Sequence, residues 1–240
     1  KNLKLLKELR FDNEIAAIVY GQDNNSMVVV EGTGYQRVLK WNSFKMPEGE
    51  LKISKELPPN TRKCFVSKNC EWVLYGLRDN IVKLEKTETG IVTHQIDSHG
   101  GWIEGAEFDP KAEKFVTLAK DGLARMFDTK SGQLLHSNNF GAEFGGHCAF
   151  SNKGDIYVLY CLFGMDSQRP LAFDSNTGKK LFEIKHGSGV SNLSFTENDS
   201  NIISSSLDYT AKIWDRNDVQ FPLQSYSVGS RVASVLHKES

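Results

Sequence analysis

Histidine, serine and aspartate residues near the end of this chain occur in an order that could support hydrolytic chemistry. His186 is followed by Ser204 and Ser206 and then by Asp208. In such a trio the histidine takes a proton from the serine, the serine attacks a carbonyl, and the aspartate orients the histidine. The sequence around the serines holds nothing like the strained turn that exposes a nucleophile. We therefore interpret the trio as structural.

The same spacing occurs a second time, which supports the structural interpretation. In each copy a histidine lies nine residues before an apolar strand residue, and an aspartate lies six residues before an aromatic residue. The two sets are His186, Phe195, Asp208 and Trp214, and His99, Phe108, Asp121 and Phe127. A reacting centre is not expected to be duplicated in this way, whereas a packing device in a repeated unit is.

Five short segments show the larger pattern to which these residues belong. They are VLKWN (38–42), VKLEK (82–86), ARMFD (124–128), PLAFD (170–174) and AKIWD (211–215). Their fourth residues follow one another at steps of 44, 42, 46 and 41 residues. A period in the low forties indicates one supersecondary unit copied along the chain.

The clearest copy, residues 180–215, reads as short strands separated by polar turns. Alternating stretches of about five residues are interrupted by Gly, Asn, Asp or Ser at every break. Four short antiparallel strands make a small sheet that cannot cover both of its own faces. Such copies must pack face to face, and the radial solution with short edges is a β-propeller.

The unit resembles a WD40 repeat, in which a Gly-His turn, an Asp turn and a Trp-Asp pair recur. The resemblance implies a network that joins the histidine, the aspartate, a Ser or Thr of the second strand and the tryptophan. In the fifth copy these would be His186, Asp208, Trp214 and Ser206, or Ser204 in its place. In the third copy His99 and Asp121 would form a partial version, with Thr117 as candidate hydroxyl, because Phe127 has no N–H to donate.

The fold class predicted is all-β, a β-propeller of four-stranded antiparallel blades with five complete WD40-like repeats. Residues 1–240 are expected to form one such propeller. The expected blades are residues 11–57, 58–99, 100–141, 142–186 and 187–227. Partial blade strands are expected in residues 1–10 and 228–240, so the sequence is interpreted as an excerpt of a longer chain. In the second copy Asp79 keeps the turn position, but Leu57 replaces the histidine and Glu85 the tryptophan.

Composition narrows the classes of partner. The net charge is −1, from 29 basic and 30 acidic residues, so no overall field favours nucleic acid or an anionic membrane. No stretch approaches the roughly 18 apolar residues of a transmembrane helix. The four cysteines show no metal-ligand spacing and are too few for a disulfide framework. A cytoplasmic or nuclear location is expected, with no cofactor and no metal.

Five residues are candidates for partner contacts. Trp102 lies in the loop HGGWIEG, and Phe144 lies on a glycine-rich connection. Arg62, Arg78 and Lys120 fall in or beside loops on the predicted narrow face. For each residue the alternative interpretation is structural: Trp102 as an ordinary family hydrophobic residue, Phe144 as filling for a degenerate blade, and the cations as solvated surface.

Because the resemblance implies a rigid platform, the function expected is a non-catalytic scaffold for protein–protein interaction. It would serve in a multiprotein complex or as the sensing region of a larger signalling protein. One alternative is an RNA-associated assembly platform, which the neutral charge disfavours. A second is a propeller enzyme with a central-channel site, which needs several converging acids or histidines that the sequence does not show.

Overall fold

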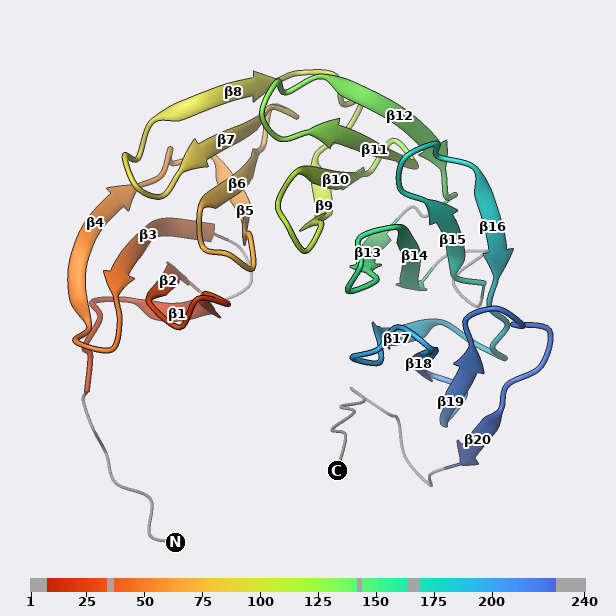
Figure 1. Cartoon of the computed structure of the whole chain (residues 1–240). Helices are drawn as coiled ribbons and strands as arrows, with labels where there is room; N and C mark the ends of the chain where they lie inside the picture. The colour runs from red at the N-terminus through yellow and green to blue at the C-terminus, as the bar shows by residue number, and fades with distance from the viewer. Residues whose placement is uncertain (1–7, 34–36, 142–143, 164–168, 228–240) are drawn as a thin grey trace, which may run out of the picture. The chain divides into compact units, whose positions relative to one another are not determined.

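The computed structural model describes residues 8–33, 37–141, 144–163 and 169–227, which form five four-stranded antiparallel sheets (Figure 1). Within each sheet, strands that follow one another in the sequence are hydrogen-bonded neighbours. The prediction of an all-β fold built from five such units is confirmed. The described part of the chain contains no helix long and apolar enough to cross a membrane. The chain divides into two compact units, residues 1–97 and 98–240.

The first unit holds two sheets. The strands of its first sheet are β1 (Glu14–Tyr20), β2 (Ser26–Thr33), β3 (Arg37–Lys45) and β4 (Glu50–Glu56). The strands of its second sheet are β5 (Thr61–Val66), β6 (Trp72–Leu77), β7 (Val82–Lys86) and β8 (Val92–Ile96). A buried apolar cluster joins the two sheets and includes Val28, Val30 and Trp41 from the first and Val73, Tyr75 and Leu77 from the second.

The second unit holds three sheets. The strands of its first sheet are β9 (Ile103–Phe108), β10 (Lys114–Ala119), β11 (Leu123–Asp128) and β12 (Leu134–Asn139). Those of the second are β13 (Phe144–Phe150), β14 (Ile156–Phe163), β15 (Leu171–Asp174) and β16 (Lys180–Glu183). Those of the third are β17 (Val190–Phe195), β18 (Asn201–Ser206), β19 (Thr210–Asp215) and β20 (Gln224–Ser227).

Each of the five expected blade ranges contains one of these sheets. Most of the two expected partial strands falls outside the described residues. Residues 1–7 and 228–240 lie outside the described residues, and residues 8–10 are not in a strand.

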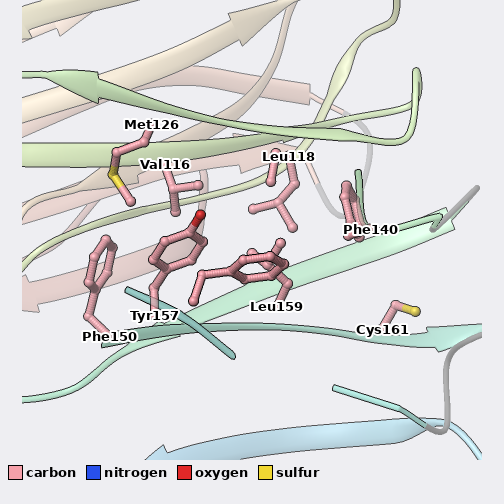
Figure 2. Packing of buried hydrophobic residues seen from close by; sticks show 10 residues of the cluster. Val116, Leu118, Met126, Phe140, Phe150, Tyr157, Leu159 and Cys161 are labelled. Atoms are coloured by element: carbon pink, nitrogen blue, oxygen red, sulfur yellow. The ribbon is translucent and has the colours of Figure 1, made fainter. Parts of the chain in front are cut away.

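Neighbouring sheets of the second unit pack face to face through apolar side chains. The cluster between its first and second sheets is drawn in Figure 2, whose labelled residues are Val116, Leu118, Met126, Phe140, Phe150, Tyr157, Leu159 and Cys161. A second cluster joins the other pair of sheets through Val158, Ile202 and Trp214. Burial at these faces is what a lone four-stranded sheet lacks, so each sheet depends on its neighbour.

Two glycines let first strands come close to a neighbouring sheet. A Cβ on Gly105 would collide with the carbonyl of Gly146, and a Cβ on Gly189 would collide with the carbonyl of Leu162. A glycine is required at each place because the neighbouring backbone occupies the position of its missing side chain.

Candidate functional site

The fifth repeat holds a buried hydrogen-bonded network. The indole Nε1–H of Trp214 donates to Ser204 Oγ at 2.8 Å, and that oxygen lies 2.7 Å from His186 Nε2. His186 Nδ1 lies 3.0 Å from Asp208 Oδ2. Since Asp208 accepts, Nδ1 carries the proton, and Nε2 accepts from the Ser204 hydroxyl. The chain of donors is therefore complete from Trp214 to Asp208.

The serine of this network is Ser204, which corrects the assignment to Ser206. Both side chains lie on the same face of β18, because alternate residues of a strand do. Ser206 lies nearer the turn, where its Oγ donates to the carbonyl of Ser188 at 3.0 Å and accepts from the amide of Asp208 at 3.1 Å. It supports the turn that carries Asp208.

Asp208 is the acceptor at the centre of its turn. Its carboxylate accepts from the amide of Gly187 at 2.7 Å and from the amide and hydroxyl of Thr210 at 2.9 and 2.6 Å. Burial alone would raise the pKa of Asp208, but the hydrogen bonds from Thr210, Gly187 and His186 lower it far below its ordinary value. Burial lowers the pKa of His186, and Asp208 opposes that effect.

This arrangement is unsuited to nucleophilic catalysis. Ser204 is fully buried, and its oxygen is occupied on both sides, by Trp214 and by His186. A serine nucleophile must face a substrate carbonyl. The geometry instead clamps β18, β19 and the connection before β17 together.

The third repeat forms half of this network. His99 Nε2 lies 2.8 Å from Thr117 Oγ1, at the position of Ser204. The expected contact of His99 with Asp121 is wrong, because His99 Nδ1 is buried without a hydrogen-bond partner. Asp121 is taken by the guanidinium of Arg125, at 2.7 Å, and by the amide of Gly100. In the fifth repeat the residue at the register position of Arg125 is Lys212, which donates to the carbonyl of Lys185 instead.

The buried imidazole of His99 predicts a specific loss of stability in acid. Burial, with a smaller effect of Arg125, lowers the pKa of His99 from 6.5 to about 4. The unfolded chain therefore binds the proton first, so the stability that this histidine contributes is complete above about pH 6.5 and is lost as the pH falls toward 4. From pH 7 to 4.5 this contribution should lower the free energy of unfolding by about 2 kcal/mol.

Urea unfolding of wild type and His99→Gln over this pH range measures the effect. The free energy of unfolding of the variant should fall by about 2 kcal/mol less than that of wild type between pH 7 and 4.5. The same change at the exposed His147 is the control for the substitution itself. Superimposable profiles for His99→Gln and wild type would contradict the assignment.

The second repeat replaces the network with a buried carboxyl group that the sequence reading missed. Glu85 is fully buried at the tryptophan position. Its Oε1 accepts from the Tyr75 hydroxyl at 2.7 Å, and its Oε2 accepts from the Trp41 indole of the first repeat at 3.2 Å. Tyr75 precedes Glu85 by ten residues, as Ser204 precedes Trp214, and this shared spacing was the available signal.

Three turns at the equivalent place differ in one informative residue. The residue after the turn aspartate has a positive φ in each: Asn80 at 68°, Gly122 at 79° and Tyr209 at 66°. Asn and Gly adopt this conformation readily, whereas a tyrosine is strained there. Tyr209 is 48% exposed, so its ring is not part of the buried core.

Tyr209 shares one end of the three sheets of the second unit with other aromatic residues. Phe163, 60% exposed, ends β14 next to Leu162, which meets Gly189 at the start of β17. The amide of Leu207 donates to the carbonyl of Gly189, so the turn of Tyr209 lies at the same end. We call the surface formed by Trp102, Lys120, Phe163 and Tyr209 the loop face.

Two of the predicted partner-binding residues meet on this loop face. The amide of Lys120 donates to the carbonyl of Trp102, and its ammonium group lies 4.5 Å from the centre of the indole ring. Lys120 Nζ also lies 3.9 Å from Glu104. The pair is half-buried, so the lysine covers part of the ring.

The other three candidates belong to other strands and turns of the chain. Arg62 is half-buried on β5, and Arg78 is exposed in the turn after β6; both belong to the first unit. Phe144 begins β13, and its side chain lies outside the described residues. In the described part of the chain, no group of three or more His, Cys, Asp or Glu is placed to hold a metal ion.

Comparison with known proteins finds one matching repeat and one related protein. The family model described as "WD domain, G-beta repeat" matches residues 178–215, which end with β19. The chain is 26% identical over 134 residues to "Guanine nucleotide-binding protein subunit beta-5b" of Danio rerio, a match covering 55% of this chain and 34% of that relative. The match thus spans about a third of the relative's length. The repeated sheets, the matched repeat and this relative support the resemblance of the chain to the WD40-repeat family.

Proposed function

We propose that this chain is a non-catalytic scaffold whose loop face binds a segment of a partner protein. The observation that carries the proposal is Tyr209, a bulky residue held with positive φ and exposed to solvent. Backbone strain of this kind costs about 1–3 kcal/mol and clusters at functional sites. The hydrogen bonds of Asp208 to the flanking Thr210 hold the turn in place, so the ring is presented at a fixed position.

The neighbours of Tyr209 fit a protein partner. Phe163 and the indole of Trp102 provide aromatic surface, and Lys120 supplies a cation at its rim. Exposed aromatic residues on rigid loops are the anchors that protein interfaces favour. The related Danio rerio protein is by name a subunit, which supports a place in a multiprotein complex or in a larger signalling protein. Four free thiols support a reducing compartment, cytoplasmic or nuclear.

The change Tyr209→Asn separates binding from folding. Asn80 shows that asparagine suits this turn, so the variant should be at least as stable as wild type, by up to about 1 kcal/mol. Partner capture from the native cell, quantified by mass spectrometry, should fall by about tenfold for the specific partners.

Tyr226→Asn is the matched control, since Tyr226 is 53% exposed on β20 and lies outside the loop face. The Tyr226→Asn variant should capture the same partners as wild type, in equal amounts. Equal capture by wild type and Tyr209→Asn would refute the loop face as the binding surface.

A further inference from the structure

A groove in the second unit is formed by residues that do not contribute to the loop face. Its volume is about 540 Å³, and its lining residues are Glu183, Lys185, Val219, Gln220 and Phe221. One wall is the end of β16, the last strand of its sheet, and the other is the connection from β19 to β20. Figure 1 shows this connection, in blue, beside the end of β16.

One wall of the groove is apolar and open to solvent. Phe221 is 78% exposed, and Leu223 beside it is 57% exposed. Val219 anchors the connection, because it packs against the buried cluster that includes Ile184 and Trp214. An exposed phenyl ring on an anchored segment offers a partner a large apolar contact at a small entropic cost.

The other wall carries excess positive charge. Glu183 Oε2 lies 3.1 Å from Lys180 Nζ, and Glu183 Oε1 lies 3.7 Å from Lys185 Nζ. The hydrogen bond from Lys180, with the charges of Lys180, Lys185 and Arg169, lowers the pKa of Glu183. Three cations therefore surround one carboxylate, and the side chain of Lys185 is 71% exposed.

The connection that forms the opposite wall also carries a carboxylate, that of Asp218. Asp218 Oδ1 accepts from the amide of Gln220 at 3.3 Å, so this carboxylate is turned toward its own connection. The chain as a whole has a net charge of −1, and the positive charge is therefore a local feature of the groove.

We infer that this groove binds an acidic peptide segment of a partner protein, with one apolar side chain of the peptide packed on Phe221. Carboxylates of the peptide would complement Lys185 and Lys180, and the apolar side chain would remove the phenyl ring from water. An RNA strand could use the same cations, but the apolar wall and the small number of cations favour a peptide. The two ligand classes make different predictions.

Fluorescence anisotropy tests the inference with the full chain and a fluorescein-labelled peptide of alternating Asp and Glu residues around one central phenylalanine. Wild type should bind with a Kd below about 1 mM, and binding should weaken with added salt. Lys185→Glu and Phe221→Ser should each weaken binding by at least about tenfold. Both residues are exposed, so circular dichroism should show unchanged folding.

Controls separate this groove from the loop face. Phe163→Ser removes an exposed phenyl ring elsewhere in the same unit. This variant and Tyr209→Asn, tested separately, should each leave the affinity for this peptide unchanged. No binding to wild type, equal binding to Phe221→Ser, or tighter binding of a labelled uridine oligomer than of the peptide would each overturn the inference. Loss of the peptide in Tyr209→Asn would assign binding to the loop face instead and also overturn it.

Discussion

Glu85→Ala should lower the free energy of unfolding of the first unit by about 4 kcal/mol. The change removes a buried side chain and leaves the Tyr75 hydroxyl and the Trp41 indole without their acceptor. A buried donor that loses its partner costs about 1–3 kcal/mol, and the cavity adds to that cost. Urea unfolding followed by tryptophan fluorescence measures the loss, and the Trp41 indole proton reports the broken bond in NMR spectra.

Two variants bracket this result. Glu85→Gln keeps the size and one acceptor oxygen and should cost about half as much. Glu71→Ala removes an exposed carboxylate from the turn before β6 and should cost less than about 0.5 kcal/mol. If Glu85→Ala proved no more harmful than Glu71→Ala, the buried carboxyl group would not hold the first two repeats together.

Asp208→Ala should destabilise the second unit by about 3 kcal/mol. The carboxylate accepts from Gly187, Thr210 and His186, and its removal leaves several donors with no acceptor in a partly buried turn. The pKa of Asp208 is lowered by folding, so its stabilisation is present above about pH 4 and is lost as the pH falls. The difference from wild type should therefore shrink in acid.

Asp79→Ala is the matched control, because Asp79 occupies the same turn position in the second repeat. Its carboxylate is exposed and makes only long contacts, 3.4 Å to the amide of Ile81 and 3.4 Å to Asn60. Its loss should cost less than about 1 kcal/mol. Thermal and urea unfolding of both variants measure the contributions of the two turns. Equal midpoints for Asp208→Ala and wild type would show that the network does not stabilise the fold.

The repeated sheets could be predicted because their signals are local. Alternating strands and polar turns recur every forty-odd residues, with an aromatic residue in the third strand of four of the five copies, and each signal can be recognised within one copy. The network of His186, Asp208 and Trp214 was expected from the resemblance to a WD40 repeat, and the offsets that carry this resemblance lie within one copy.

The remaining details depend on contacts that spacing does not encode. Ser204 and Ser206 share a face of β18, so alternation could not choose between them. Arg125 takes the carboxylate that His99 was expected to hold, a competition decided by side-chain geometry. Glu85 was missed because Trp41, one of its partners, belongs to another repeat 44 residues away.

The surface residues illustrate the same limit. Trp102 was recognised by its loop, HGGWIEG, and Lys120 by its place beside a loop on the predicted narrow face. The two side chains do come together. Phe163 and Tyr209 were not, since their exposure and the positive φ of Tyr209 are properties of the folded backbone. Arg62 and Arg78 were grouped with Lys120 because all three fall in or beside loops on the predicted narrow face, and the structure assigns these two arginines to the first unit.

Gly105 and Gly189 give the second unit a property that no side chain could supply. Where each glycine meets the backbone of the adjacent sheet, the two sheets touch, while elsewhere bulky rings such as Tyr157 and Trp214 hold them apart. We expect this contrast to give the contact between neighbouring sheets the form of a wedge and so to influence the angular step from one blade to the next. A single methyl group at residue 105 or 189 would blunt that wedge. Because a ring closes only when its steps add up to a full turn, the smallest residues of a repeat constrain how many copies a propeller can hold.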